Sequence, residues 1–212
     1  DGERLPAPAE IDAALPLVDW SQVQVDDAAG TVLLRQPGMR LDLGAIAKGY
    51  AADEVERILL ASHVKAAVVD LGGNIKVVGR KPDGSAWRVG IQNPFDERGS
   101  YIGIANLEGG DTVVTSGIYE RYFIGGDGRH YHHIFSSETG YPVDNGLVSV
   151  TVICRSSMEA DGLSTTLFSL GLEDGMAFAE TLEGVEAIFI DAERNVYPTT
   201  GATSLFTLTD TS

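Results

Sequence analysis

Short apolar runs recur along the whole chain, and turn residues separate them. Runs of about four to eight residues with this punctuation predict β-strands rather than helices. Asp27–Gly30, Lys81–Gly84 and Gly125–Gly128 are typical turn segments. The strands expected from the pattern are Val23–Val25, Thr31–Leu34, Ala66–Leu71, Ile75–Val78, Trp87–Gln92, Tyr101–Leu107, Thr112–Thr115, Tyr119–Ile124, Arg129–Phe135, Leu147–Cys154, Val185–Asp191 and Leu205–Thr209.

Helical periodicity replaces this pattern in a few places. Ser156 and Glu159 fit a capping box at the start of one such segment, and Gly171 fits its C-cap. Gly49 lies inside another, where a glycine costs about 1 kcal/mol relative to alanine and so indicates close packing or close approach of a ligand. The expected helices are a short stretch around Ala9–Leu15, Ala45–Ala61, one that begins near Ser156, and Glu173–Leu182.

The fold expected from these elements is α+β. Many short strands joined by hairpins, with a few helices packed on them, predict largely antiparallel sheets. The length of 212 residues fits a single domain over residues 1–212, or two interleaved and tightly joined subdomains.

The formal net charge of −16 narrows the choice of partners. A nucleic acid or an anionic membrane surface would need an excess of Lys and Arg, so neither is expected. A polyanionic small ligand would need a metal ion or backbone donors to offset repulsion by the negative charge of the protein. Cys154 lies in an apolar run and is interpreted as a small buried hydrophobic residue.

Asp161 and Thr165 are four residues apart on a predicted helix and therefore share a face. A carboxylate and a hydroxyl are hard oxygen ligands that suit Mg²⁺. The N-terminal amides of the same helix would also favour an anion at this end. The alternative is structural: Asp161 complements the dipole of its own helix, and Thr165 is merely packed.

The segment from Asp42 to Lys48 is a second candidate. Asp42 is expected to end a strand, and Lys48 lies in the first turn of the following helix, where a cation is unfavourable. That placement suggests that Lys48 contacts an anion or an adenine. The alternative is a solvated lysine paired with Asp53 or Glu54.

Two further groups could carry chemistry. On a strand, His130 and His132 would face one side and His133 the other. One of these histidines could act as a general base near neutral pH. The alternatives are exposed histidines beside a hairpin or, with further ligands, a zinc site. Ser116, in Thr115–Gly117, could offer its hydroxyl to a phosphate or belong to an ordinary strand-ending turn.

The order of these motifs is more specific than any one of them. Together they resemble the motifs of the ApbE family of FAD:protein FMN transferases. The segments that carry the resemblance are Leu41–Asp53, Asp70–Asn74, Thr115–Gly117, Tyr119–Phe123, His132–Ile134, Thr139–Pro142, Ser149–Val152 and Ala160–Thr165.

The resemblance implies an activity: Mg²⁺-dependent transfer of the FMN half of FAD to a threonine of an acceptor protein, with release of AMP. It implies that Asp161, Thr165 and the backbone carbonyl of Ala45 bind Mg²⁺, and that Asp42 and Lys48 contact FAD. His133 would lie near the flavin phosphate and help to deprotonate the acceptor hydroxyl. Alternatives are a protein that stores FAD and an FAD pyrophosphatase that yields FMN and AMP.

The implied partners are FAD and an acceptor protein with a Ser/Thr-Gly-Ala-Thr-like segment. The chain's own Thr199–Ser204 is similar to such a segment, but we interpret it as a small-residue turn before the closing strand. Only 40 residues precede Leu41, so the chain is expected to be truncated at its N-terminus relative to the family. The family resemblance also implies an exported protein in the periplasm or at the outer face of the cytoplasmic membrane, with a lipid anchor in the full-length form.

Overall fold

The computed structural model describes residues 4–209. The chain divides into two compact units that interleave along the sequence: Asp1–Leu43 with Arg121–Val143, and Gly44–Glu120 with Asp144–Ser212. No helix within the described part of the chain is long and apolar enough to cross a lipid bilayer.

The first unit is built from short elements. Its antiparallel hairpins pair β1 with β2 and β8 with β9, and the first of them closes through the predicted turn at 27–30. The bounds are α1 Pro8–Ala14, β1 Val23–Asp26, β2 Thr31–Leu34, β8 Tyr122–Ile124 and β9 His130–His132, with 3₁₀ turns at Leu15–Leu17 and Trp20–Gln22.

The second unit contains two antiparallel sheets. A six-stranded sheet has the order β12-β11-β10-β7-β4-β3, and a three-stranded sheet has the order β13-β6-β5. The strand bounds are β3 Ala66–Asp70, β4 Asn74–Gly79, β5 Trp87–Gln92, β6 Tyr101–Leu107, β7 Thr112–Gly117, β10 Leu147–Cys154, β11 Glu186–Asp191, β12 Val196–Pro198 and β13 Phe206–Leu208. The α+β fold with antiparallel sheets is thereby confirmed.

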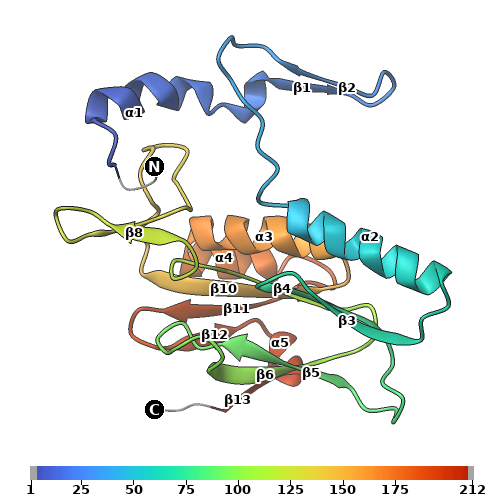
Figure 1. Ribbon diagram of the computed structural model, residues 1–212. Coiled ribbons are helices and arrows are strands. Elements are labelled where there is room, and N and C mark those ends of the chain that lie inside the picture. Colours follow the sequence, from blue (N-terminus) through green and yellow to red (C-terminus); the bar gives the residue numbers. More distant parts are fainter. Residues whose placement is uncertain (1–3, 210–212) are drawn as a thin grey trace. The chain divides into compact units, whose positions relative to one another are not determined.

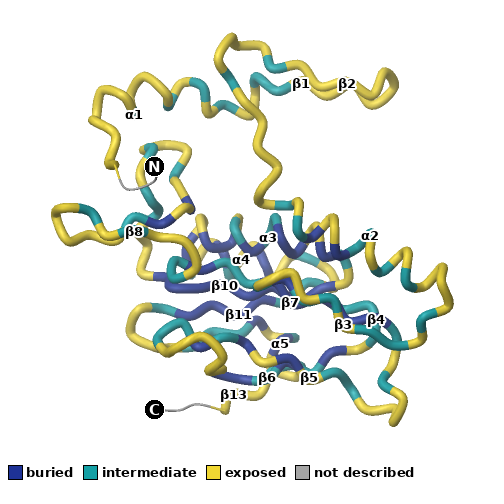
Figure 2. The backbone as a smooth tube through the Cα atoms, viewed as in Figure 1, coloured by how far each residue is buried: buried dark blue, intermediate teal, exposed yellow. Residues whose placement is uncertain are grey.

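Helices cover one face of the six-stranded sheet, and the smaller sheet lies on its other face (Figure 1). The covering helices are α2 Ala47–Ala61, α3 Ser157–Leu170 and α4 Leu172–Ala179. The short helix α5, Ala202–Leu205, lies on the other face, where it contacts β6, β11 and β13. Between the sheets, a core of branched aliphatic side chains includes Val77, Ile91, Val113, Ile153 and Ile188. Figure 2 shows the buried backbone concentrated in β10, β11 and the sheet-facing side of α3.

Alternation along β7 and β10 decides which side chains reach the helices. Val113 and Ile153 are opposite each other in the ladder and enter the core between the sheets. Because successive residues point to opposite faces, Val114 and Ser116 face α3. A polar side chain of β7 can therefore meet a helix residue that is far away in sequence.

A few local expectations were wrong. Leu41–Leu43 forms no strand, so Asp42 does not end one, and Tyr119 lies in a turn that precedes β8. The segment around Thr203 is not a plain turn, because Ala202–Leu205 forms the one-turn helix α5. The strand Val196–Pro198 carries a proline and was not anticipated. Proline is tolerated there because β12 is an edge strand.

Candidate functional site

Helices α2 and α3 make close backbone contact at Gly49. A Cβ atom at this position would lie 2.1 Å from the carbonyl oxygen of Ser157 and 2.6 Å from Cα of Met158. Any side chain would therefore push the start of α3 away from α2. The close packing expected at this glycine is confirmed.

Asp161 reaches across this contact from α3 to α2. Its Oδ2 accepts a hydrogen bond from the backbone amide of Gly49 at 2.8 Å. The residue is only 5% exposed. Burial raises the pKa of the Asp161 carboxyl above its usual value, although the amides of Gly49 and Lys48 and the charge of Lys48 oppose the shift. Asp161 therefore complements the N-terminus of α2, not that of its own helix.

A cluster of hydroxyls lies beside this carboxylate. Ser116 Oγ of β7 lies 3.1 Å from Thr165 Oγ1 and 2.8 Å from Ser164 Oγ. Ser164 Oγ in turn donates to the backbone carbonyl of Asp161 at 3.0 Å. The fold therefore brings together Asp161, Thr165 and Ser116, which the sequence singled out in separate motifs.

The N-terminal amides of α3 are already bonded. Asp53 of α2 accepts from the amide of Ser157 at 2.9 Å and from that of Met158 at 3.0 Å. Ser156 Oγ accepts from the amide of Glu159 at 3.2 Å, as its predicted capping role requires. The expectation that these amides would favour a bound anion is therefore wrong, because side chains of the protein occupy them.

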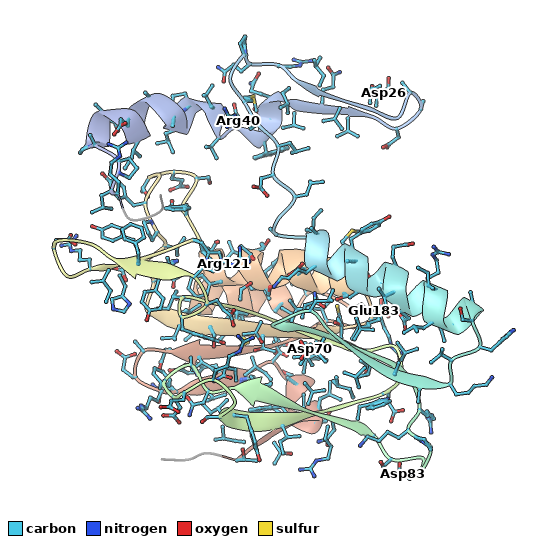
Figure 3. All side chains as sticks on the ribbon, viewed as in Figure 1. Asp26, Arg40, Asp70, Asp83, Arg121 and Glu183 are labelled. Atoms are coloured by element: carbon cyan, nitrogen blue, oxygen red, sulfur yellow. The ribbon has the colours of Figure 1, made fainter. Side chains whose placement is uncertain are left out.

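Lys48 extends from the first turn of α2 to the turn between β3 and β4. Its Nζ donates to the carbonyl oxygen of Gly72 at 3.1 Å, instead of pairing with Asp53 or Glu54. Gly72 and Gly73 both have positive φ, at 71° and 75°, which explains the paired glycines in this turn. Asp70, labelled in Figure 3, ends β3, and its Oδ1 accepts from the amide of Gly72 at 2.9 Å.

Asp42 and His133 belong to the first unit. Asp42 is exposed in an irregular segment. His133 is exposed just after β9, and its Nδ1 lies 3.2 Å from the backbone oxygen of Arg121. His132 is not an exposed histidine beside a hairpin: it is 6% exposed, and its Nε2 lies 2.9 Å from the backbone oxygen of Val143.

The donor set around Asp161 fits a hard cation. Among residues 4–209, no three His, Cys, Asp or Glu side chains gather as a metal-binding group, so a cation here would also need hydroxyl, carbonyl, water or phosphate oxygens. Such a mixture of oxygen ligands is typical of Mg²⁺. Asp161 joins none of the ion pairs in the described part of the chain. A buried carboxylate that has a raised pKa and forms no ion pair is stabilised in its ionised form when a metal binds.

Sequence patterns missed Asp53 and Lys76 as members of the region. Asp53 was considered as a partner of Lys48 and as the last residue of the motif Leu41–Asp53, and Lys76 was not singled out. The available indication was a lysine within the apolar run Ile75–Val78, where a charged side chain needs a buried partner.

Known proteins are similar to this chain in sequence. A protein of Klebsiella pneumoniae (strain 342) named FAD:protein FMN transferase is 43% identical over 195 residues, which are 92% of this chain and 59% of that protein. A protein of the same name from Treponema pallidum (strain Nichols) is 37% identical, over 95% of this chain and 59% of its own length. The chain thus spans about three fifths of these relatives.

Solved structures agree with the sequence comparisons. The ApbE protein of Thermotoga maritima superposes with a TM-score of 0.86 at 32% identity, covering 95% of this chain and 64% of its own. The flavinyl transferase ApbE of Pseudomonas stutzeri superposes with a TM-score of 0.79 at 38% identity, covering 96% of this chain and 62% of its own. The model of the ApbE family matches residues 1–189, so the chain belongs to the ApbE family.

Proposed function

We propose that this chain is the core of a Mg²⁺-dependent FAD:protein FMN transferase. The acceptor threonine hydroxyl attacks the FMN-side phosphorus of FAD, a new phosphorus–oxygen bond forms, and the bond to the AMP phosphate breaks. AMP leaves and the hydroxyl proton passes to a base. One observation carries the proposal: a buried carboxylate, Asp161, lies beside a cluster of hydroxyls at the junction of two helices in a chain of this family.

Asp161, Thr165 and the carbonyl of Ala45 are the residues that would hold the metal. When bound, a divalent cation neutralises charge on the two phosphates of FAD and orients them. Ser116 supports this set by holding the hydroxyl of Thr165. With a net charge of −16, the protein would otherwise repel a dinucleotide, so local compensation by the metal and by Lys48 is needed.

Asp42 and Lys48 are proposed to contact FAD, and His133 to accept the proton. The hydrogen bond between His133 and Arg121 supports this role for the histidine. A carbonyl oxygen can only accept, so Nδ1 must carry the hydrogen. In the neutral imidazole Nε2 then has a lone pair that can take a proton from a hydroxyl.

The test is to incubate the chain with FAD, Mg²⁺ and a peptide that carries a Ser/Thr-Gly-Ala-Thr segment. Mass spectrometry of the peptide should show added FMN, and AMP should appear in equal amount. A peptide with alanine in place of the acceptor threonine is the control. Tight FAD binding without AMP would instead indicate a storage protein. AMP release at the same rate with either peptide would indicate a pyrophosphatase.

Export of the full-length protein, with a lipid anchor, is a separate proposal that rests on the family resemblance alone. Fractionation of cells that produce the full-length protein tests it, since an unprocessed protein confined to the cytoplasm would contradict it.

A further inference from the structure

A buried lysine lies beneath the junction of α2 and α3. The side chain of Lys76, on the helix-facing side of β4, is 2% exposed. Its Nζ lies 3.3 Å from Asp53 Oδ1 and 3.0 Å from Glu56 Oε2. It also donates to the carbonyls of Gly110, at 2.9 Å, and Arg155. Burial of an ammonium group is costly, and four oxygen partners around one nitrogen offset that cost.

Asp53 is the member of this network that reaches the site helix. One carboxylate both faces Lys76 and accepts from the amides of Ser157 and Met158, the first residues of α3. A carboxylate at a helix N-terminus is favourable because it satisfies free amides and complements the helix dipole. Here the cap comes from another helix, so the same contact also joins α2 to α3.

Asp161 makes the matching contact in the opposite direction. It extends from α3 to the first turn of α2, where it accepts from Gly49. Gly49 and Asp53 are one helical turn apart on α2, as are Ser157 and Asp161 on α3. The two carboxylates therefore cap each other's helices, and the contact of Gly49 with the Ser157 carbonyl lies between them.

The start of α3 is also tied to the sheet. Ser157 Oγ donates to Asn74 Oδ1 at 2.8 Å and accepts from Thr112 Oγ1 at 3.1 Å. Both partners are completely buried. The position of α3 along the sheet is thus set at its first residue, one turn before Asp161.

We propose that Asp53 and Lys76 are positioning residues for the site at Asp161. Lys76 fixes the Asp53 carboxylate, Asp53 fixes the first turn of α3, and this turn sets where Asp161 meets α2. Neither residue contacts FAD or the metal. The part of this inference that concerns metal affinity rests on the proposed function; the part that concerns the Asp161–Gly49 contact does not.

The test compares Asp53→Asn with Glu54→Gln, a neighbouring loss of one negative charge on the same helix. Within residues 4–209, the one ion pair of Glu54 is with Arg57 at the surface. In the metal-free chain, hydrogen exchange of the Gly49 amide should become about fivefold faster in Asp53→Asn, because asparagine keeps one acceptor oxygen where the carboxylate used both for the amides of Ser157 and Met158. The Val152 amide in the centre of β10 serves as the internal reference, because general destabilisation would accelerate both. Mg²⁺ titration by calorimetry should show affinity about tenfold weaker, which is typical when a supporting partner of a ligand is removed.

Lys76→Met provides a second variant that acts on the same contact through Asp53, and should change both measurements in the same direction. Wild-type values of both the Gly49 exchange ratio and Mg²⁺ affinity in Asp53→Asn and Lys76→Met would overturn the inference. If the wild-type chain shows no Mg²⁺ binding, the proposed function fails, while the Gly49 exchange ratio still decides whether Asp53 positions Asp161.

Discussion

Replacement of Gly49 by alanine tests the helix junction most directly. The new Cβ would lie 2.1 Å from the Ser157 carbonyl oxygen, whereas ordinary contacts begin near 3.4 Å. The start of α3 would have to withdraw by roughly 1.3 Å, since the atoms it meets are backbone and cannot rotate away. Such a shift would stretch the 2.8 Å contact between Gly49 and Asp161 beyond hydrogen-bond distance.

The energetic consequence is a balance of opposing terms. Overpacking costs about 1–3 kcal/mol, and loss of a hydrogen bond to a carboxylate costs about 1.5–3 kcal/mol. Alanine recovers about 1 kcal/mol through its higher helix propensity. We therefore expect Gly49→Ala to lower the free energy of unfolding by about 3 kcal/mol, which for a chain of this size lowers Tm by about 6–12 °C.

Urea and thermal unfolding followed by circular dichroism measure this effect. Gly162→Ala is the matched control, because Gly162 is also inside a helix of this junction but its Cβ would make only an ordinary 3.4 Å contact with Ile46. That variant should be unchanged or up to about 1 kcal/mol more stable. Equal stability of Gly49→Ala and the wild type would refute the backbone contact, and with it the account of the junction.

The remaining predictions concern buried charge and the thiol. Asp161→Asn should abolish Mg²⁺-dependent AMP release while Tm stays within a few degrees, because the amide oxygen can still accept from α2; unchanged turnover in Mg²⁺ would show that the metal site is elsewhere. Lys76→Met should cost about 3 kcal/mol in urea unfolding, since it leaves two carboxylates without their buried partner, whereas Arg57→Gln at a surface pair should cost less than about 1 kcal/mol. Similar costs for the two would contradict the buried network. Burial raises the pKa of the Cys154 thiol to about 11, so at pH 8 iodoacetamide should modify it far more slowly in the native than in the urea-unfolded chain. At pH values between the usual pKa of a thiol and about 11, the unfolded chain releases the Cys154 proton while the native chain retains it. The contribution of this thiol to the free energy of unfolding therefore falls as pH rises. Equal alkylation rates of the native and unfolded chains, measured by mass spectrometry, would disprove the burial of Cys154.

Local sequence information was enough to define many of the elements. The strands Trp87–Gln92, Tyr101–Leu107 and Leu147–Cys154 have the bounds that their apolar runs predicted, and the capping of α3 at Ser156 and Gly171 was expected. Each depends on residues within a few positions of one another, where alternation, caps and turn residues act directly on the backbone. Elements with mixed signals, such as the proline-containing strand Val196–Pro198, were missed.

The motifs likewise identified residues of the site region, but they did not identify the contacts between those residues. Sequence spacing placed Asp161 and Thr165 on one helix face and suggested close approach at Gly49. It could not show that the Asp161 carboxylate bonds to an amide 112 residues away, or that Asp53 occupies the amides that were expected to attract an anion. Those partners depend on how α2 and α3 pack on the sheet. Packing is decided by contacts between residues far apart in the chain, which no local periodicity encodes.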